Sequence, residues 1–87
     1  MPRKNNNYTK PNYRLKALLL EVVDNQMKNN DPPVTNEAFK RLVSEGYSPE
    51  KAKERIASVV VEYIFYIMKY GNTFDLKKYI DDLKALK

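Results

Sequence analysis

The chain has 87 residues, 43% of them hydrophobic and 31% charged, which suits one small globular domain and excludes an intrinsically disordered chain. It contains no cysteine and no histidine, so disulfides and thiolate metal sites are excluded, and the commonest general base and transition-metal ligand is missing. The longest apolar run, residues 56–68, is shorter than the ~20 residues that span a bilayer. We therefore expect a soluble, cytoplasmic protein that is not an enzyme.

The net charge of +5 comes from the N-terminal region. Five of the 16 basic residues precede Glu21, the first acidic residue, which leaves 11 basic residues to balance 11 acidic ones. Residues 1–11 combine prolines and asparagines with no apolar period, which is typical of a disordered arm. The sequence thus predicts a flexible basic arm over residues 1–11 and a single helical domain over residues 12–87.

A first helix is predicted from about Asn12 to Lys28, because apolar residues there recur at helical spacing. The residues expected on its inner face are Leu15, Leu18, Leu19, Val22 and Gln26. Residues 29–33, which are asparagine, aspartate and proline, have low helix propensity and end this helix.

Two starts compete for a second helix. Asp31 could cap it with Pro32 in the first position, but the following proline disfavours the helical conformation for Pro32. Thr35 is therefore the preferred N-cap, and Gly46 supplies a left-handed stop. The residues expected to be buried are Ala38, Phe39, Leu42 and Val43.

The third helix has the clearest boundaries. Ser48 is a strong N-cap residue, Pro49 suits the first helical position, and Gly71 marks the end, which gives about 22 residues or about 33 Å of helix. Its β-branched and aromatic content would also suit a strand, but there is no second strand-like segment to pair with it. One apolar face contains Ala52, Ile56, Val59, Val60, Tyr63, Ile67 and Tyr70, and it is broadened by Ala57, Val61, Ile64 and Met68. The opposite, polar stripe contains Arg55, Ser58, Glu62, Tyr66 and Lys69.

A fourth helix follows a short link, with Asp75 as its N-cap and Phe74 and Tyr79 placed as a hydrophobic staple. Its inner face is expected to hold Ile80, Leu83 and Leu86. The predicted fold class is all-α, an irregular four-helix bundle with the long third helix at its centre.

The sequence predicts no catalytic, cofactor-binding or metal site. Ser48 is explained as a helix cap, and without histidine a nucleophilic hydroxyl would need a lysine or carboxylate base. Asp81 and Asp82 are adjacent on a helix and point about 100° apart, so they do not form an acid–base pair. The two glycines both lie at helix ends, which excludes a glycine-rich phosphate loop.

Two groups of residues are candidate contacts to a partner. Basic residues interleaved with tyrosines near the N-terminus could follow a phosphate backbone and stack on bases, although a solubilising tail explains them as well. These candidate nucleic-acid contacts are Arg3, Lys4, Tyr8, Lys10, Tyr13, Arg14 and Lys16. The other candidate is Tyr66, an aromatic residue on the polar stripe of the third helix, where aromatic side chains often mark an interface.

Part of the chain resembles a family of short bacterial proteins of unknown function. The residues that carry the resemblance are Asn30, Asp31, Pro32, Pro33, Leu42, Gly46, Tyr47, Ser48, Ala52, Glu62, Gly71, Phe74, Asp75, Tyr79 and Leu83. They span residues 29–83 and leave the N-terminal arm outside. The resemblance implies a compact helical fold in a bacterial cytoplasm, and it brings no activity or ligand.

The leading functional hypothesis is a small non-catalytic protein–protein interaction module. A helix that is apolar on so many sides, in so small a domain, is expected to leave a patch that a partner must cover. The partner would be an unidentified protein or a second copy of the chain in a homodimer. The alternative is a nucleic-acid-associated protein that binds through its basic arm. No membrane, cofactor or small-molecule substrate is expected.

Overall fold

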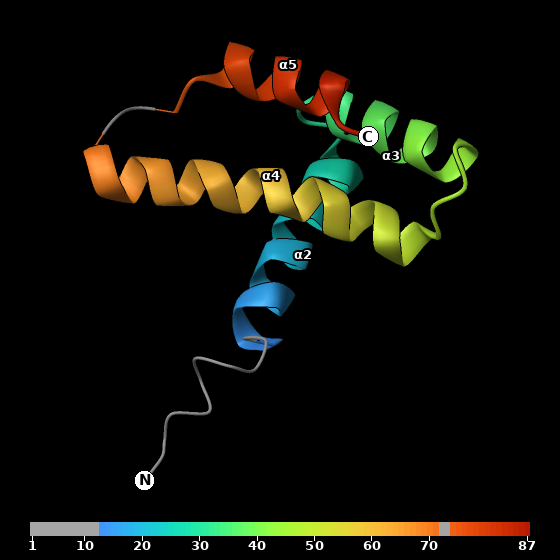
Figure 1. Cartoon of the computed structure of the whole chain (residues 1–87), viewed down its shortest axis with the longest axis horizontal. Helices are drawn as coiled ribbons and strands as arrows, with labels where there is room; N and C mark the ends of the chain where they lie inside the picture. The colour runs from blue at the N-terminus through green and yellow to red at the C-terminus, as the bar shows by residue number, and fades with distance from the viewer. Residues whose placement is uncertain (1–12, 72–73) are drawn as a thin grey trace, which may run out of the picture.

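The computed structural model describes residues 13–71 and 74–87, which form four helices (Figure 1). These are α2 (Tyr13–Asn29), α3 (Pro33–Ser44), α4 (Pro49–Tyr70) and α5 (Leu76–Ala85). The described residues contain no strand, so the all-α prediction is confirmed for them. The predicted disordered arm, and the predicted start of the first helix at Asn12, lie outside the described residues.

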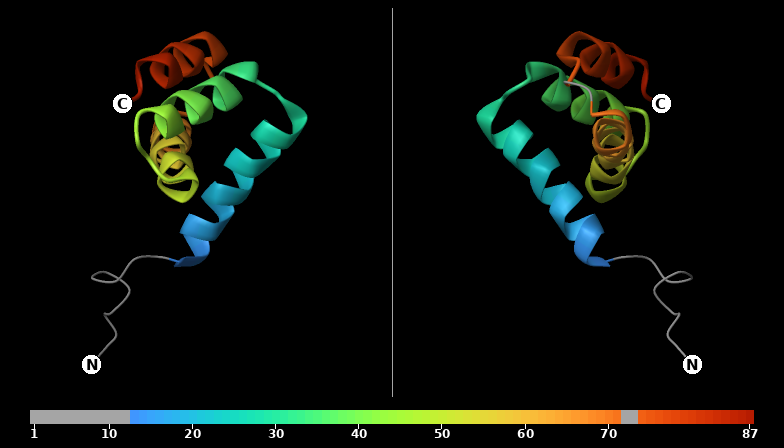
Figure 2. Two further views of the ribbon diagram at one scale, coloured as in Figure 1. Left: turned by 90° about the vertical axis from the view of Figure 1, so that its right-hand side faces the viewer. Right: turned by 90° about the vertical axis from the view of Figure 1, so that its left-hand side faces the viewer.

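The helix α4 contacts each of the other three helices. Figures 1 and 2 show α3 and α5 on one side of α4, while α2 crosses α4 at a steep angle. The ends of α4 are those that the sequence predicts: the Ser48 hydroxyl accepts a hydrogen bond from the Lys51 backbone N–H at 3.1 Å, and Gly71 is left-handed with a φ of 67°. At α5, the Asp75 carboxylate accepts from the Lys78 N–H at 3.1 Å, which confirms that cap as well.

The predicted start of α3 is wrong. The helix begins at Pro33, and Thr35 lies inside it with its side chain buried. The adjacent proline does hold Pro32 in an extended conformation, with φ −78° and ψ 153°. That conformation keeps Pro32 out of the helix but suits an N-cap residue. The Pro32 carbonyl accepts a hydrogen bond from the Thr35 backbone N–H at 3.2 Å. At the other end of α3, Val43 is exposed rather than buried.

The face of α2 that packs on the core differs in part from the prediction, although Leu19 and Gln26 face the core as expected. Val23 is fully buried, whereas Leu15, Leu18 and Val22 are exposed. The helix is apolar on two adjacent faces, and two ion pairs to α4 form in the orientation in which Val23 turns inward. Lys16 lies 2.9 Å from Glu54, and Asp24 lies 2.7 Å from Lys53. An apolar stripe of α2 is therefore left on the outside. The buried hydrophobic core comprises Val23, Val34, Ala38, Leu42, Ala52, Ile56, Ala57, Val59, Val60, Tyr79 and Leu83.

A polar cluster around Gln26 links α2, α3 and α5. The Gln26 side-chain oxygen accepts hydrogen bonds from the Thr35 hydroxyl at 2.7 Å and from the Tyr79 hydroxyl at 3.0 Å. Thr35 and Tyr79 are 0% and 2% exposed, so neither hydroxyl has ready access to bulk water. Burial raises the pKa of Tyr79, which keeps its hydroxyl protonated as a donor.

We predict that Gln26→Met lowers the free energy of unfolding by about 2–4 kcal/mol, because it removes the acceptor that two buried hydroxyls share. Tyr79→Phe removes one donor and should cost about 1 kcal/mol. Asn25→Met, at the exposed neighbouring position, is the control and should change stability by less than about 0.5 kcal/mol. Urea unfolding followed by circular dichroism measures all three. Equal stabilities for the Gln26 and Asn25 variants would show that the cluster does not hold the helices together.

Candidate interaction surface

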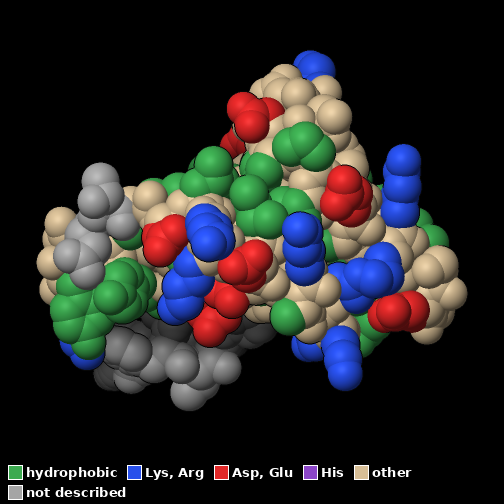
Figure 3. Space-filling model, turned by 90° about the horizontal axis from the view of Figure 1, so that it is seen from above, with side chains coloured by type: hydrophobic (Ala, Val, Ile, Leu, Met, Phe, Trp, Pro, Cys, Tyr) green, Lys and Arg blue, Asp and Glu red, His purple; other side chains and the backbone are tan. Residues whose placement is uncertain are grey.

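The second half of α4 extends beyond the helices that cover its first half. All the buried residues of α4 lie between Ala52 and Val60, and none follows Val60. Beyond that point Phe65 is 56% exposed and Met68 is 74% exposed. The large apolar side chains exposed on this part of α4 are Ile64, Phe65, Tyr66, Met68 and Tyr70. Figure 3 shows hydrophobic side chains gathered at the end of the molecule where α4 terminates.

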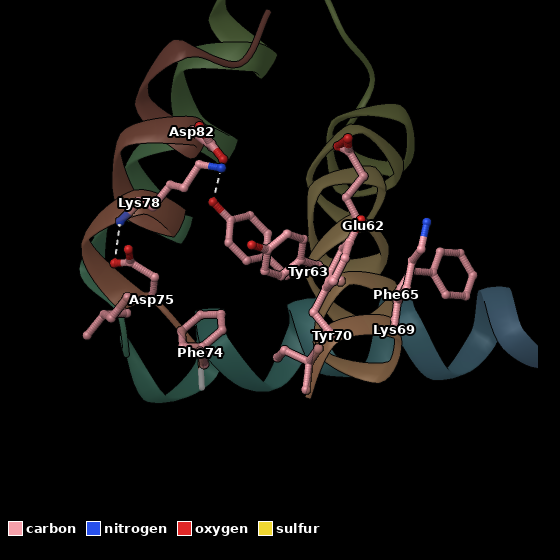
Figure 4. A pocket seen from close by; sticks show the side chains of 12 residues that line it. Glu62, Tyr63, Phe65, Lys69, Tyr70, Phe74, Asp75, Lys78 and Asp82 are labelled. Carbon is pink, nitrogen blue, oxygen red and sulfur yellow. Dashed lines mark hydrogen bonds between the residues drawn. The ribbon is translucent and has the colours of Figure 1, made fainter. Parts of the chain in front are cut away.

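A cleft of about 950 Å³ separates this part of α4 from the N-terminal end of α5 (Figure 4). It exists because α5 is held at its other end: the Arg41 guanidinium of α3 donates to the carbonyls of Leu83 at 3.0 Å and Leu86 at 2.6 Å. The aromatic residues Tyr63, Tyr66, Tyr70 and Phe74 line much of the cleft.

An aromatic cluster fills the inner end of the cleft. The ring of Tyr63 packs edge-on against Phe74 and Tyr79, at centroid distances of 5.7 and 5.3 Å, and Phe74 packs on Tyr79 at 5.3 Å. The last contact confirms the predicted staple at the start of α5. The Tyr63 hydroxyl also donates a hydrogen bond to Asp82 on α5.

The electrostatics of the cleft keep the Tyr63 hydroxyl protonated. Burial first, and then the hydrogen bond to the Asp82 carboxylate, raise the pKa of Tyr63 above its ordinary value of 10.0. The Tyr63 hydroxyl thus remains protonated near neutral pH and acts as a structural donor. The remaining lining combines aromatic rings with the charged side chains of Glu62, Lys69, Asp75 and Lys78.

A second, smaller groove of about 370 Å³ lies between α2 and α4. Leu15 and Leu19 of α2 and Ala57 and Val61 of α4 are among its lining residues. The ion pair of Lys16 with Glu54 borders it, and their hydrogen bond raises the pKa of Lys16 and lowers that of Glu54. Val61, at the edge of this groove, shares one helical face of α4 with Ile64, Phe65 and Met68, and we call this the outer face.

The structure places the predicted contact residues in two separate regions. Tyr66 is exposed on the cleft, with its ring 4.8 Å from that of Tyr70. Tyr13 and Arg14 are exposed at the start of α2, and Lys16 pairs with Glu54, twelve residues or about 18 Å of helix before Tyr66. The other candidates, which lie outside the described residues, are Arg3, Lys4, Tyr8 and Lys10.

The sequence prediction missed most of the exposed surface. Phe65 was assigned to neither face of the helix, and Tyr70 was expected in the core although it is exposed. The available signal was length, since a helix of about 22 residues cannot be covered along its whole length by the shorter helices predicted beside it.

Within residues 13–71 and 74–87, no group of three or more acidic, cysteine or histidine residues is arranged to hold a metal ion. Among the same residues, no helix is both long and apolar enough to cross a bilayer. Comparisons with protein-family models, curated proteins and solved structures found no match to the chain.

We predict that the domain loses stability above about pH 10 partly through Tyr63 and Tyr79. Both tyrosines have a higher pKa in the folded than in the unfolded chain. Their contribution to the free energy of unfolding is therefore complete below pH 10 and is lost as the pH rises. Free energies of unfolding at about pH 8 and about pH 11 test this. Replacement of either tyrosine by Phe should reduce the loss between the two pH values, whereas Tyr13→Phe, at an exposed site, should leave it unchanged. A loss of the same size in all three variants would contradict the assignment.

Proposed function

We propose that this protein is a non-catalytic protein–protein interaction module, and that its contact surface is the end of α4 beyond Val60. The observation that supports this is the exposure of large apolar side chains close together there, with Met68 the most exposed. Monomeric proteins rarely leave a large contiguous apolar patch in water without using it.

The composition of the surface supports the same proposal. Aromatic residues and methionine are enriched in the centres of protein interfaces, whereas lysine and glutamate are depleted there. The α4 end follows this pattern, because Phe65, Tyr66, Met68 and Tyr70 are exposed while its charged residues, Glu62 and Lys69, share one stripe.

The wider proposal is an irregular four-helix bundle that works in a bacterial cytoplasm, as the sequence resemblance implies. Nucleic-acid binding through the basic N-terminal region remains the second hypothesis. Its described candidates, apart from Lys16 in its pair with Glu54, are Tyr13 and Arg14.

We predict that Met68→Glu abolishes partner binding without unfolding the domain, since it places a charge in the middle of the apolar surface. Val43→Glu is the matched control, because Val43 is also an exposed apolar residue on a helix but lies on α3. Tagged forms of the wild type and both variants are used in pull-downs from cell extract and in light scattering at micromolar concentration, after circular dichroism has confirmed that they fold.

The wild type and Val43→Glu should retain the same partner or the same self-association, and Met68→Glu should lose at least about 90% of it, an effect of about 1.4 kcal/mol or more. A monodisperse monomer that recovers no partner would contradict the proposal. Equal binding by both variants would assign the contact to another surface.

A further inference from the structure

The outer face of α4 is bordered on one side by two opposite charges. Glu62 and Lys69 are seven residues apart, which is two helical turns, so they lie on the same flank of the helix. Figure 4 shows Phe65 and Lys69 on the side of α4 that faces away from α5, and both also border the cleft. Neither Glu62 nor Lys69 has a salt bridge among the described residues, although Lys69 lies 5.3 Å from the ring of Tyr70.

We propose that the occupant of the outer face is a second copy of this chain, packed with its α4 antiparallel to the first. This inference rests on the proposed function and names the partner. With the two-fold axis between Phe65 and Tyr66, Glu62 of each copy lies level with the partner's Lys69, so two ion pairs border the contact. A parallel two-fold pair would instead place the charged flanks of the two copies on opposite sides of the contact, so neither ion pair could form.

The apolar side chains fit the same arrangement. The partner's Met68 lies level with Tyr63, between the levels of Val61 and Ile64, so that the side chains of one face enter the gaps of the other. The partner's Tyr70 lies level with Val61, where the groove between α2 and α4 begins. The partner's α4 therefore ends at Gly71, level with the part of α4 that borders α2.

The exposed area of the outer face suits a weak, reversible dimer. Phe65 has 56% of its surface exposed, which corresponds to roughly 100 Å² for an aromatic side chain. Ile64, Phe65 and Met68 are 37%, 56% and 74% exposed and Val61 is half-buried, so the four side chains from each copy would bury roughly 600–800 Å² in total, which is typical of a weak, transient contact. We therefore expect a dimer that dissociates in the micromolar range or above.

The experiment reverses the two charges separately. Sedimentation velocity of the full chain from about 5 to about 500 μM, at low salt to limit screening, measures the dissociation constant of the wild type, Glu62→Lys and Lys69→Glu. Each single reversal should weaken the dimer at least about fivefold, because both ion pairs become repulsive. Glu37→Lys, which reverses an exposed charge on α3, is the control and should leave the constant unchanged.

Two further samples identify the arrangement. The double variant Glu62→Lys with Lys69→Glu restores opposite charges and should return the constant to within about twofold of the wild type. A mixture of the two single variants should also associate more tightly than either variant alone. The Glu62→Lys copy is positive at both positions and the Lys69→Glu copy is negative at both, so the mixed dimer has two attractive pairs whereas each homodimer has two repulsive ones.

If the wild type dimerises and the charge reversals leave its dissociation constant unchanged, the antiparallel arrangement is wrong. If the wild type stays monomeric at every concentration, the occupant of the outer face is not a second copy of the chain. In that case the pull-down with Met68→Glu still decides the proposed function, since loss of a captured protein in that variant would show a different partner on the same surface.

Discussion

The structure depends on a mismatch in helix length. Pro49–Tyr70 forms 22 residues of helix, whereas α3 has 12 residues and α5 has 10. The steeply crossing α2 covers only a short part of α4 (Figure 1). Complete burial of a large apolar side chain contributes about 1.5–3 kcal/mol, so each half-exposed residue near the end of α4 leaves about 1 kcal/mol unused within the monomer. A partner that covers this end would recover that free energy.

The other helices are fixed in ways that keep the end of α4 uncovered. The ion pairs of Lys16 and Asp24 hold α2 across the first half of α4, and Arg41 holds the C-terminal end of α5 against α3. The hydrogen bonds to Gln26 join α2, α3 and α5 on the same side of the molecule. The core is thus built around the first half of α4, which also borders the groove beside α2, and the second half projects from it along the aromatic cleft.

Local signals made part of this fold predictable. The caps at Ser48, Gly71 and Asp75 depend on side chains within a few residues, so the boundaries of α4 and the start of α5 could be read from the sequence. The rotation of α2 could not, because Leu18 and Val22 on one face are as apolar as Leu20 and Val23 on the next, and the choice between them is made by contacts with α4. The candidate surface was predictable only in outline: the apolar circumference of α4 indicated that something must cover it, but the exposure of Phe65 and Met68 depends on where α2 crosses and where α5 diverges.

The most direct test of the central claim, that the end of α4 is a contact surface, is methyl NMR of the methionines. Met68 lies on the exposed end of α4, whereas Met27 is partly buried against the core. As the protein is concentrated, or as a captured partner is added, the Met68 methyl signal should shift or broaden while the Met27 signal stays constant. A Met68 signal that stays unchanged while association is observed by scattering would contradict the account.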